Sequence, residues 1–455
     1  MSVSPHLHLM GVGGVGMCGI AEVLLAQGLT VSGCDLADNE RTRRLVELGA
    51  EIHQGHEPGH LEGVDALIVT AAVSLEHPEL KAASERGLPV VRRAEMLAEL
   101  MRLKRGVAVA GTHGKTTTTA IIGHLLTAAG ADPTVIVGGR AHFLGSHARV
   151  GEAPLLVCEA DEYDRSFLEL APHLAVITNL EPEHLDCYGS EEELRAAFTT
   201  FANRASVFGA AIVCADDPGA WSLRDDLRRK VVGYGISEEA EMRLEITASE
   251  AHGTEFAVFR KDRRLGDVLL PLPGSFNALN ALAAITVGLE LGLEFDILAA
   301  ACADFSGVAR RFEVRGDRGG VTVVDDYAHH PTEIKALLEA TRQAMPGRRV
   351  VAVFQPHLYS RTRDFAKDFA SALLGAEVAI VLPIYPAREE PIEGVSSQLV
   401  VEEAVRLGHP RVLAGPPIGE AVLQLEELLE PGDVLLTVGA GDVDDLAAAW
   451  LEGAA

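Results

Sequence analysis

A glycine loop near residue 111 carries the residue types that bind the phosphates of ATP. The loop follows an apolar run at 106–110 and precedes a stretch of helical character. Its residues are Gly111, Thr112, His113, Gly114, Lys115, Thr116 and Thr117. In such loops the lysine reaches the β- and γ-phosphates, and the threonine hydroxyl that follows it ligates Mg²⁺. Val109 stands where a general P-loop has its first glycine, so the motif is a variant. We predict that Lys115 is catalytic and that Thr116 contacts the metal.

A second glycine-rich loop lies near the start of the chain and fits the pattern G-x-G-x-x-G. It comprises Gly11, Gly13, Gly14, Val15 and Gly16, between a strand-like run and a helix-like run. Glycines let the backbone approach a diphosphate, and the helix N-terminus offers unpaired N–H groups. Asp35 follows about 20 residues later, where an acid can bind a ribose hydroxyl. On this motif alone NAD or FAD is the expected ligand, and a tight turn without a ligand is the alternative.

Acidic residues follow two further apolar runs. The segment 159–164 (EADEYD) comes directly after the run at 154–158, and a second group at 179–186 contains Asn179, His184 and Asp186. The carboxyl ends of parallel strands meet at the crevice where ligands bind, so we expect both groups near the loop at 111–117. Carboxylate oxygens suit Mg²⁺. A solvated acidic loop is the alternative interpretation.

The elements that must position these residues alternate between strand and helix. Strand-like runs occur at 6–10, 30–34, 66–70, 106–110, 154–158, 174–178, 211–214, 321–324, 349–354, 378–382 and 433–438. A β-rich alternation at 255–259 and a helix at 277–292 interrupt this order. The alternation predicts an α/β fold with parallel sheets and right-handed crossovers. Because the pattern restarts twice, we predict three segments, with boundaries near 103 and 308.

Composition excludes several classes of protein. The chain has 455 residues, a formal charge of −27, 48% apolar residues and 23% charged residues, which indicates a globular protein without a general nucleic-acid-binding face. Six cysteines without a CxxC pair favour reduced thiols over a disulfide framework or a zinc ribbon. The N-terminal residues do not follow a signal-peptide pattern, and no run of about 18 apolar residues occurs. We therefore expect a cytoplasmic protein with no membrane span.

Taken together, the motifs resemble those of the Mur ligases, the ATP-dependent amide-bond formers of peptidoglycan synthesis. The similarity covers essentially the whole chain, and its eight motifs occur in the family's order. They are GVGGVGMCGIAE at 11–22, GTHGKTTTTA at 111–120, EADEYDRSF at 159–167, TNLEPEHLDCY at 178–188, NALNALAA at 277–284, GVARRFE at 307–313, DDYAHHPTE at 325–333 and FQPHLYSRT at 354–362. The chain is most similar to the members that join L-alanine to UDP-N-acetylmuramate.

The resemblance implies three domains with separate ligands. A Rossmann-like domain at 1–103 would bind the UDP-sugar through the first glycine loop, which replaces NAD as the expected ligand. A P-loop-type ATPase domain at 104–308 would hold ATP and Mg²⁺. A Rossmann-like domain at 309–455 would bring the amino acid. The expected state is a monomer or a weak homodimer.

Individual site residues follow from the family motifs. Glu159 and His184 resemble metal ligands beside Thr116, and His184 and Asp35 also belong to the expected UDP-sugar contacts. Asn277 and Asn280 match asparagines near adenine, and Arg311 and Asp326 match nucleotide-contacting positions. The residues that match the region of the incoming amino acid are Tyr327, His330, His357 and Arg361.

The implied reaction activates a carboxylate. Transfer of the γ-phosphoryl group of ATP gives an acyl phosphate, the amine of L-alanine attacks it, and phosphate leaves. Such transfer depends on positioning and charge neutralisation, which Lys115 and Mg²⁺ can supply. His357 is a candidate for the base that accepts the amine proton, and Arg361 suits the amino-acid carboxylate.

Three positions depart from the family pattern. Several sister ligases carry a carbamylated lysine in the helix matching 194–199, where this chain has none, as in the alanine-adding members. Phe276 replaces a common histidine, and Leu358 replaces a common arginine. The alternatives are a recycling ligase that attaches a tripeptide to the same UDP-sugar, a nucleotide-binding module without catalysis, and a dinucleotide oxidoreductase.

Overall fold

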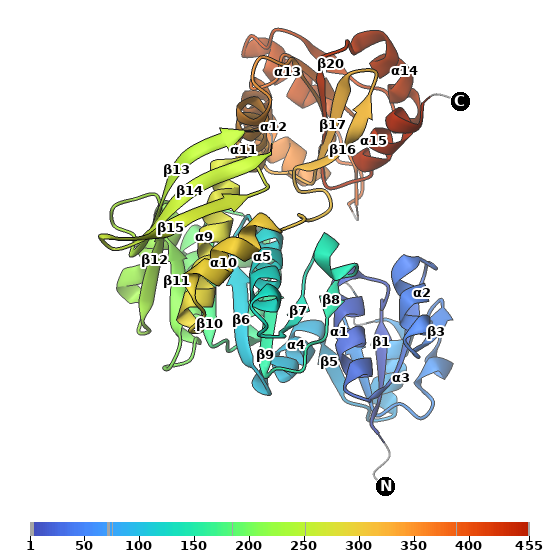
Figure 1. Cartoon of the computed structure of the whole chain (residues 1–455). Coiled ribbons are helices and arrows are strands. Elements are labelled where there is room, and N and C mark those ends of the chain that lie inside the picture. The colour runs from blue at the N-terminus through green and yellow to red at the C-terminus, as the bar shows by residue number, and fades with distance from the viewer. Residues whose placement is uncertain are drawn as a thin grey trace. The chain divides into compact units, whose positions relative to one another are not determined.

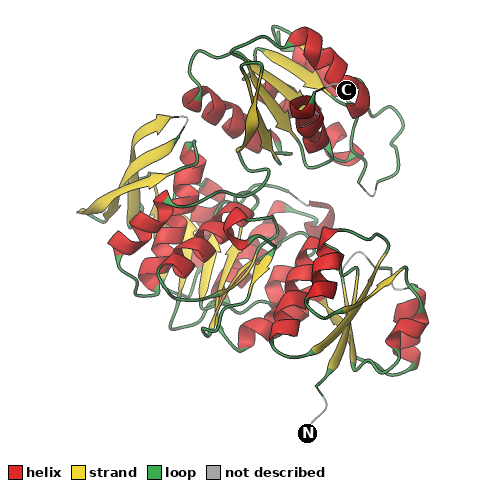
Figure 2. Cartoon of the chain, turned by 45° about the vertical axis from the view of Figure 1, so that its right-hand side comes forward, coloured by secondary structure: helices red, strands yellow, loops and turns green. Residues whose placement is uncertain are grey.

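The computed structural model contains three β-sheets flanked by helices (Figures 1 and 2). It describes residues 4–70, 73–74, 76–183, 185–250, 252–387 and 389–453. The contacts divide the chain into two compact units. Unit 1 comprises 1–245, 256–269 and 279–306, and unit 2 comprises 246–255, 270–278 and 307–455. The three sheets and the mixed α/β architecture confirm the predicted fold class. None of the helices in the described residues is long and apolar enough to cross a membrane.

The first sheet of unit 1 is fully parallel and has the strand order β3-β2-β1-β4-β5. Its strands are β1 (His6–Met10), β2 (Thr30–Asp35), β3 (Glu51–Gln54), β4 (Ala66–Val69) and β5 (Val90–Arg92). The helices of this part are α1 (Val15–Ala26), α2 (Glu40–Glu47), α3 (Pro78–Glu85) and α4 (Arg93–Arg102), together with the short 3-10 helix η1 (Pro58–Leu61). The glycine loop at 11–16 therefore joins the central strand to the N-terminus of α1.

The second sheet has the order β15-β14-β13-β12-β11-β10-β6-β9-β7-β8. Its central strands are β6 (Arg105–Ala110), β9 (Leu155–Glu159), β10 (Leu174–Ile177) and β11 (Ala210–Cys214), which run parallel to one another. The remaining strands are β7 (Thr134–Ile136), β8 (Ala148–Arg149), β12 (Val231–Gly235), β13 (Met242–Glu250), β14 (Gly253–Arg260) and β15 (Arg263–Leu270). Strand β6 lies between β9 and β10, so the loops after these three strands share one edge.

Helices pack on this sheet and close the core of unit 1. They are α5 (Lys115–Ala128), α6 (Leu185–Tyr188), α7 (Glu191–Asn203), α8 (Pro218–Ser222), α9 (Ser275–Glu290) and α10 (Phe295–Ala303). Helix α5 packs against α10 (Figure 1). One hydrophobic cluster includes Leu9 and Ile20, which lie around the first sheet, and Ile136 and Phe198, which lie around the second sheet. The two glycine loops therefore belong to a single packed body.

Unit 2 contains a six-stranded sheet with the order β16-β17-β21-β18-β19-β20. Its strands are β16 (Glu313–Arg318), β17 (Val321–Asp326), β18 (Val350–Phe354), β19 (Val378–Val381), β20 (Val412–Ala414) and β21 (Val434–Val438). Only β16 is antiparallel to its neighbour. Its helices are α11 (Pro331–Ala344), α12 (Tyr359–Leu373), α13 (Gln398–Arg406), α14 (Ile418–Leu428) and α15 (Val443–Glu452). They cover both faces of the sheet (Figure 2), and a separate hydrophobic cluster fills each face.

Candidate active site

The phosphate loop, residues 111–117, joins β6 to α5 and depends on two glycines. Gly111 has φ +144°, and a Cβ there would lie 1.9 Å from Thr178 Oγ1. Gly114 is the N-cap of α5 with φ +79°, and a Cβ there would lie 2.8 Å from Asn280 Oδ1. No side chain caps this helix. Because the first N–H groups of a helix lack intrahelical partners and carry the positive end of its dipole, the loop suits an anion.

The strand beside β6 holds the phosphate loop in shape. Asn179, two residues after β10, accepts the backbone N–H of His113 at 2.7 Å and donates to the carbonyl of His113 at 3.1 Å. Thr178 Oγ1 donates to the same carbonyl at 2.6 Å. The Thr112 hydroxyl accepts the N–H of Glu181 at 3.0 Å. Within the predicted segment 179–186, Asn179 and Glu181 therefore lie against the loop.

Lys115 is held by a carboxylate that the sequence did not single out. Its Nζ donates to Glu162 Oε1 at 2.8 Å and to the carbonyls of Gly111 and Thr112 at 2.5 and 3.2 Å. The Lys115 side chain is 17% exposed and that of Glu162 only 3%. Burial alone would lower the pKa of Lys115, but Glu162 and Asp161 raise it above its ordinary value. Burial raises the pKa of Glu162, and Lys115 opposes that rise. The ammonium therefore stays charged at the mouth of the loop.

Hard oxygen donors lie beside Lys115. Glu159 ends β9, and its carboxylate accepts the N–H of Gly138 at 2.5 Å. Burial raises the pKa of Glu159, while the hydrogen bond from Gly138, the charge of Lys115 and the Thr116 hydroxyl lower it. A hydroxyl and a carboxylate are ligands of the kind that Mg²⁺ prefers, so these two residues fit the predicted metal. The third predicted ligand, His184, lies outside the described residues.

The first glycine loop, residues 11–16, is closed by its neighbours. Asp35 Oδ2 accepts the N–H of Gly13 at 2.9 Å, so this acid binds the loop itself. Arg41 donates to the carbonyl of Gly13, and a Cβ on Gly16 would lie 3.0 Å from Arg93 Nη1. Two guanidinium groups therefore stand at the uncapped N-terminus of α1. Both arginines were absent from the sequence prediction, because 41 and 93 approach the loop only in the fold.

The two asparagines of α9 bind different partners, a side-chain hydroxyl for Asn280 and a backbone carbonyl for Asn277. Asn280 Oδ1 accepts from the Thr118 hydroxyl at 3.0 Å, which ties α9 to the first turn of α5. Asn277 Nδ2 donates to the carbonyl of Pro273 at 2.8 Å within unit 2. Both side chains are buried. Asn280 therefore lies next to the phosphate loop.

In unit 2, Asp326 organises the predicted nucleotide-contacting residues. Its carboxylate accepts the N–H groups of Phe312 at 2.7 Å and Ala328 at 2.8 Å. Burial raises its pKa to about 6, and the charge of Arg311 opposes that rise. Arg311 also lies over the ring of Tyr327, 5.2 Å from its centroid. Arg311, Asp326 and Tyr327 thus form one group at the carboxyl end of β17.

The predicted amino-acid region gathers at the neighbouring strand ends. The ring of His357, three residues after β18, stacks on Tyr385 at 5.8 Å and lies 6.0 Å from the ring of His329. Burial, His329 and Arg361 lower the pKa of His357 to about 4. His330 instead caps α11, because its Nδ1 accepts the N–H of Thr332 at 3.4 Å. His357 is therefore a neutral imidazole near pH 7, as a general base must be.

Strained backbone marks the same edge of unit 2. Arg310, Phe312 and Leu358 have φ values of 59°, 48° and 70°. Non-glycine residues in this region cost free energy, and they cluster at functional sites. Leu358, the departure from the family pattern, is the N-cap of α12, and its N–H donates to the carbonyl of Tyr385 at 2.9 Å. Its backbone thus fixes the loop that carries His357.

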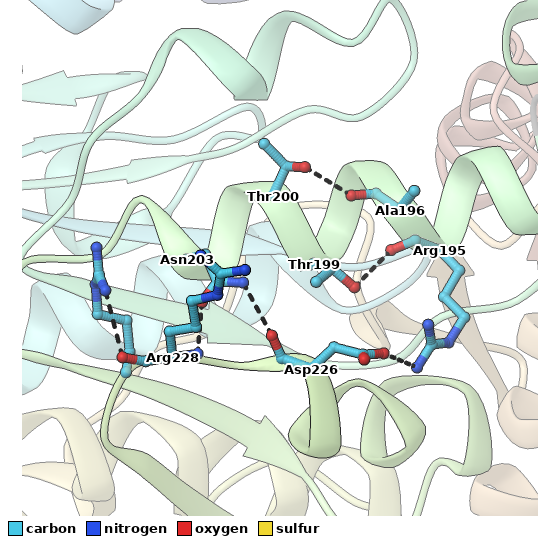
Figure 3. Close-up of a pocket in the computed structure, with 8 residues that line it drawn as sticks. Arg195, Ala196, Thr199, Thr200, Asn203, Asp226 and Arg228 are labelled. Atoms are coloured by element: carbon cyan, nitrogen blue, oxygen red, sulfur yellow. Dashed lines mark hydrogen bonds and ion pairs between the residues drawn. The ribbon is translucent and has the colours of Figure 1, made fainter.

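A separate pocket of about 630 Å³ lies between α7 and the segment 226–229 (Figure 3). It is lined by Arg195, Ala196, Thr199, Thr200, Asn203, Asp226, Arg228 and Arg229. Arg195 pairs with Asp226 at 2.6 Å (Figure 3). The pocket includes none of the predicted site residues.

The fold and the two glycine loops define an α/β nucleotide-binding protein of several domains. Family models match almost all of the chain: "Mur ligase family, catalytic domain" at 6–105, "Mur ligase middle domain" at 109–288 and "Mur ligase, glutamate ligase domain" at 310–441. The chain therefore belongs to the Mur ligase family.

Similar proteins carry one recurring name. UDP-N-acetylmuramate–L-alanine ligase of Salinibacter ruber is 48% identical over 98% of this chain and 94% of that protein. The enzyme of the same name from Nitratidesulfovibrio vulgaris is 46% identical over 98% of both chains. The crystal structure of UDP-N-acetylmuramate–alanine ligase from Thermotoga maritima matches with a TM-score of 0.83 and 30% identity over 98% of both chains. A murein peptide ligase from Psychrobacter arcticus matches in fold, with a TM-score of 0.72 and 22% identity over 99% of this chain and 98% of that one.

Proposed function

We propose that this Mur ligase joins L-alanine to the carboxylate of UDP-N-acetylmuramate at the expense of ATP, giving ADP and phosphate. The observation that carries the proposal is the pair of glycine loops in one packed body, one beside Lys115 and the other beside two arginines. The names of the full-length relatives support the choice of substrates. The recycling reaction with a tripeptide remains the second candidate, and nothing in the site favours it.

We infer that the phosphate loop binds ATP and that Lys115 neutralises the γ-phosphoryl group as it moves to the sugar carboxylate. The uncapped N-terminus of α5 supplies further N–H donors for the phosphates. Thr116, Glu159 and His184 would hold Mg²⁺, which supplies charge neutralisation when bound. Asn277, Asn280, Arg311 and Asp326 remain the proposed contacts to the rest of the nucleotide.

The first glycine loop would hold the diphosphate of the UDP-sugar. Gly11, Gly13, Gly14, Val15 and Gly16 provide the close backbone approach, with Asp35 shaping the loop. Arg41 and Arg93 place two cations beside this loop. Two cations suit a bound diphosphate, whereas a turn without a ligand would not need them. Arg41 and Arg93 therefore extend the set of UDP-sugar contacts.

The amino acid would be received in unit 2. His357, neutral near pH 7, would take a proton from the amine of L-alanine as nitrogen attacks the acyl phosphate. Arg361 would hold the amino-acid carboxylate, and Tyr327 and His330 would shape the surroundings. We also propose that the protein is cytoplasmic, where ATP and UDP-sugars are made, and acts as a monomer or weak homodimer.

The test is phosphate release from ATP with UDP-N-acetylmuramate and a panel of acceptors. The proposal expects release only when the sugar nucleotide is present, with L-alanine the preferred acceptor. Release that requires the tripeptide would assign the recycling reaction instead. No release with any acceptor, in a protein that still binds ATP, would indicate a nucleotide-binding module.

A further inference from the structure

A cluster of metal-ligand side chains lies in the first part of unit 1, away from the phosphate loop. One donor atom each from His8, Cys34, His60 and Glu79 lies within 4.8 Å of all the others. His8, Cys34 and Glu79 are fully buried, and the His60 side chain is 13% exposed. The four residues come from β1, β2, η1 and α3, so four elements converge on one point.

The spacing of these atoms suits a four-coordinate ion. Cys34 Sγ lies 3.4 Å from both His8 Nε2 and Glu79 Oε2, and His60 Nδ1 lies 3.0 Å from Glu79 Oε1. Zinc bonds of about 2.0–2.3 Å in a tetrahedron require ligand atoms about 3.3–3.8 Å apart. The cluster therefore needs only small side-chain movements to surround an ion.

The hydrogen bond at His8 Nδ1 determines which ring nitrogen of His8 offers a lone pair to the cluster. In its Nδ1–H tautomer, His6 donates from Nδ1 to the carbonyl of Gly63 at 3.2 Å, because a carbonyl only accepts. His6 Nε2 then accepts from the Ser32 hydroxyl at 2.8 Å. The same hydroxyl oxygen, 2.8 Å from His8 Nδ1, must accept from that nitrogen. His8 Nε2 is left unprotonated and faces Cys34, as in sites where an outer hydrogen bond fixes the tautomer of a metal-binding histidine.

The charge balance of the cluster is a second, independent argument for a bound cation. The Glu79 carboxylate is 0% exposed, and among the described residues the cationic groups that pair with it are the imidazoles of His56 and His60. A buried carboxylate beside a thiol, without lysine or arginine, lacks a permanent counter-charge. A divalent ion would be neutralised by the Glu79 carboxylate and a Cys34 thiolate together.

We propose that His8, Cys34, His60 and Glu79 form a binding site for Zn²⁺ that is separate from the Mg²⁺ site of the phosphate loop. A set of two nitrogens, one sulfur and one oxygen is typical of zinc rather than of magnesium or calcium. His56 Nδ1 lies 3.0 Å from Cys34 Sγ, so His56 is an alternative ligand. The His56 side chain is 19% exposed, so an ion can reach the cluster from solvent past this residue. Cys34 immediately precedes Asp35, so the ion would brace the strand end that closes the first glycine loop.

The full chain, stripped with a chelator and dialysed, is titrated with Zn²⁺ against a chromophoric competitor, and its zinc content is measured by mass spectrometry. The expected result is one tightly bound zinc per chain, with affinity at least about 100-fold weaker in Cys34→Ser and in His60→Asn. Cys302→Ser, which removes a buried thiol in α10, and His252→Asn, which removes an exposed imidazole, are the matched controls. Both should bind zinc as tightly as the parent chain does. Ser32→Ala should weaken binding by about 10–100-fold, because it removes the partner that orients His8.

Cobalt substitution reports the sulfur ligand directly. Co²⁺ should give a thiolate charge-transfer band in the parent, in Ser32→Ala and in Cys302→Ser, but not in Cys34→Ser. Circular dichroism confirms that each variant is folded, and the partly exposed His60 provides a test if Cys34→Ser does not fold. A stoichiometry well below one zinc per chain, or zinc binding by both Cys34→Ser and His60→Asn as tight as in the parent, would overturn the proposal.

Discussion

Replacing Lys115 by methionine should separate catalysis from stability at the phosphate loop. Methionine keeps much of the side-chain length but removes the ammonium that donates to Glu162 and to two loop carbonyls. Removing one preorganised donor for developing charge typically costs about 10²–10³ in kcat, or about 3–4 kcal/mol. We expect at least this loss of turnover. Binding of UDP-N-acetylmuramate to the first glycine loop should largely survive.

The same change should destabilise the fold, because it leaves Glu162 buried without its cation. The Glu162 side chain is 3% exposed, and breaking a buried ion pair from one side costs about 3–5 kcal/mol. Burial already raises the pKa of Glu162, and without Lys115 it rises further. A folded Lys115→Met chain therefore takes up a proton there more readily than an unfolded one. Its stability defect should be smallest at acidic pH and should grow as pH rises through the raised pKa.

The double variant Lys115→Met/Glu162→Gln isolates the two effects. Glutamine removes the buried charge, so the double variant should recover most of the lost stability while remaining as inactive as Lys115→Met. Glu162→Gln alone should lose less than about tenfold in kcat, because two carbonyls still hold the ammonium. Phosphate release measures activity, and urea unfolding at several pH values measures stability. The reasoning is refuted if the double variant is as unstable as Lys115→Met, or if Glu162→Gln is as inactive.

Three further predictions concern unit 2. Because the pKa of His357 is lowered to about 4, the acid limb of the kcat–pH profile should lie near pH 4 rather than near neutral pH. His357→Gln should lower kcat about 10²–10⁴-fold. A kcat equal to that of the parent would exclude His357 as the general base. Arg361→Ala should raise KM for L-alanine about 10–100-fold, the value of a charge-assisted contact of about 1.5–3 kcal/mol, with KM for ATP as the internal control. The pKa of Asp326, raised to about 6, means that the folded state binds a proton more tightly than the unfolded one, so unit 2 should gain stability as pH falls from about 6 to about 4. Asp326→Asn should reduce that gain in thermal unfolding, and an unchanged pH dependence would show that another group is responsible.

Much of the fold was predictable because long apolar runs dictate buried parallel strands. The predicted strands, among them 6–10, 106–110 and 433–438, and the predicted helix at 277–292 agree with the structure to within two residues. The strands that sequence analysis missed include β5 and β20, which are three residues long and partly exposed, so their burial does not impose a pattern. The region after 240 was predicted as β-rich, but its division into β13, β14 and β15 depends on pairing rather than on local sequence.

The candidate site was predictable where its residues form a contiguous sequence motif. It was not predictable where the fold brings together residues that are distant in the sequence. The loop around Lys115 is contiguous, and its glycines are required by positive φ and close contacts. The choice of Glu162 as the lysine's partner required the geometry, because three other carboxylates stand in the same short run. Arg93 and the cluster of His8, Cys34, His60 and Glu79 are brought together from distant positions, so no local spacing reveals them.

The most direct test of the proposed reaction follows oxygen from substrate to product. UDP-N-acetylmuramate labelled with ¹⁸O in its carboxylate is incubated with the full chain, ATP, Mg²⁺ and L-alanine. If the carboxylate attacks the γ-phosphoryl group and L-alanine then displaces phosphate, one ¹⁸O atom should appear in each phosphate released, and the sugar nucleotide should gain one alanine. Phosphate free of label would mean that water attacks ATP and that no acyl phosphate forms, which would contradict the mechanism.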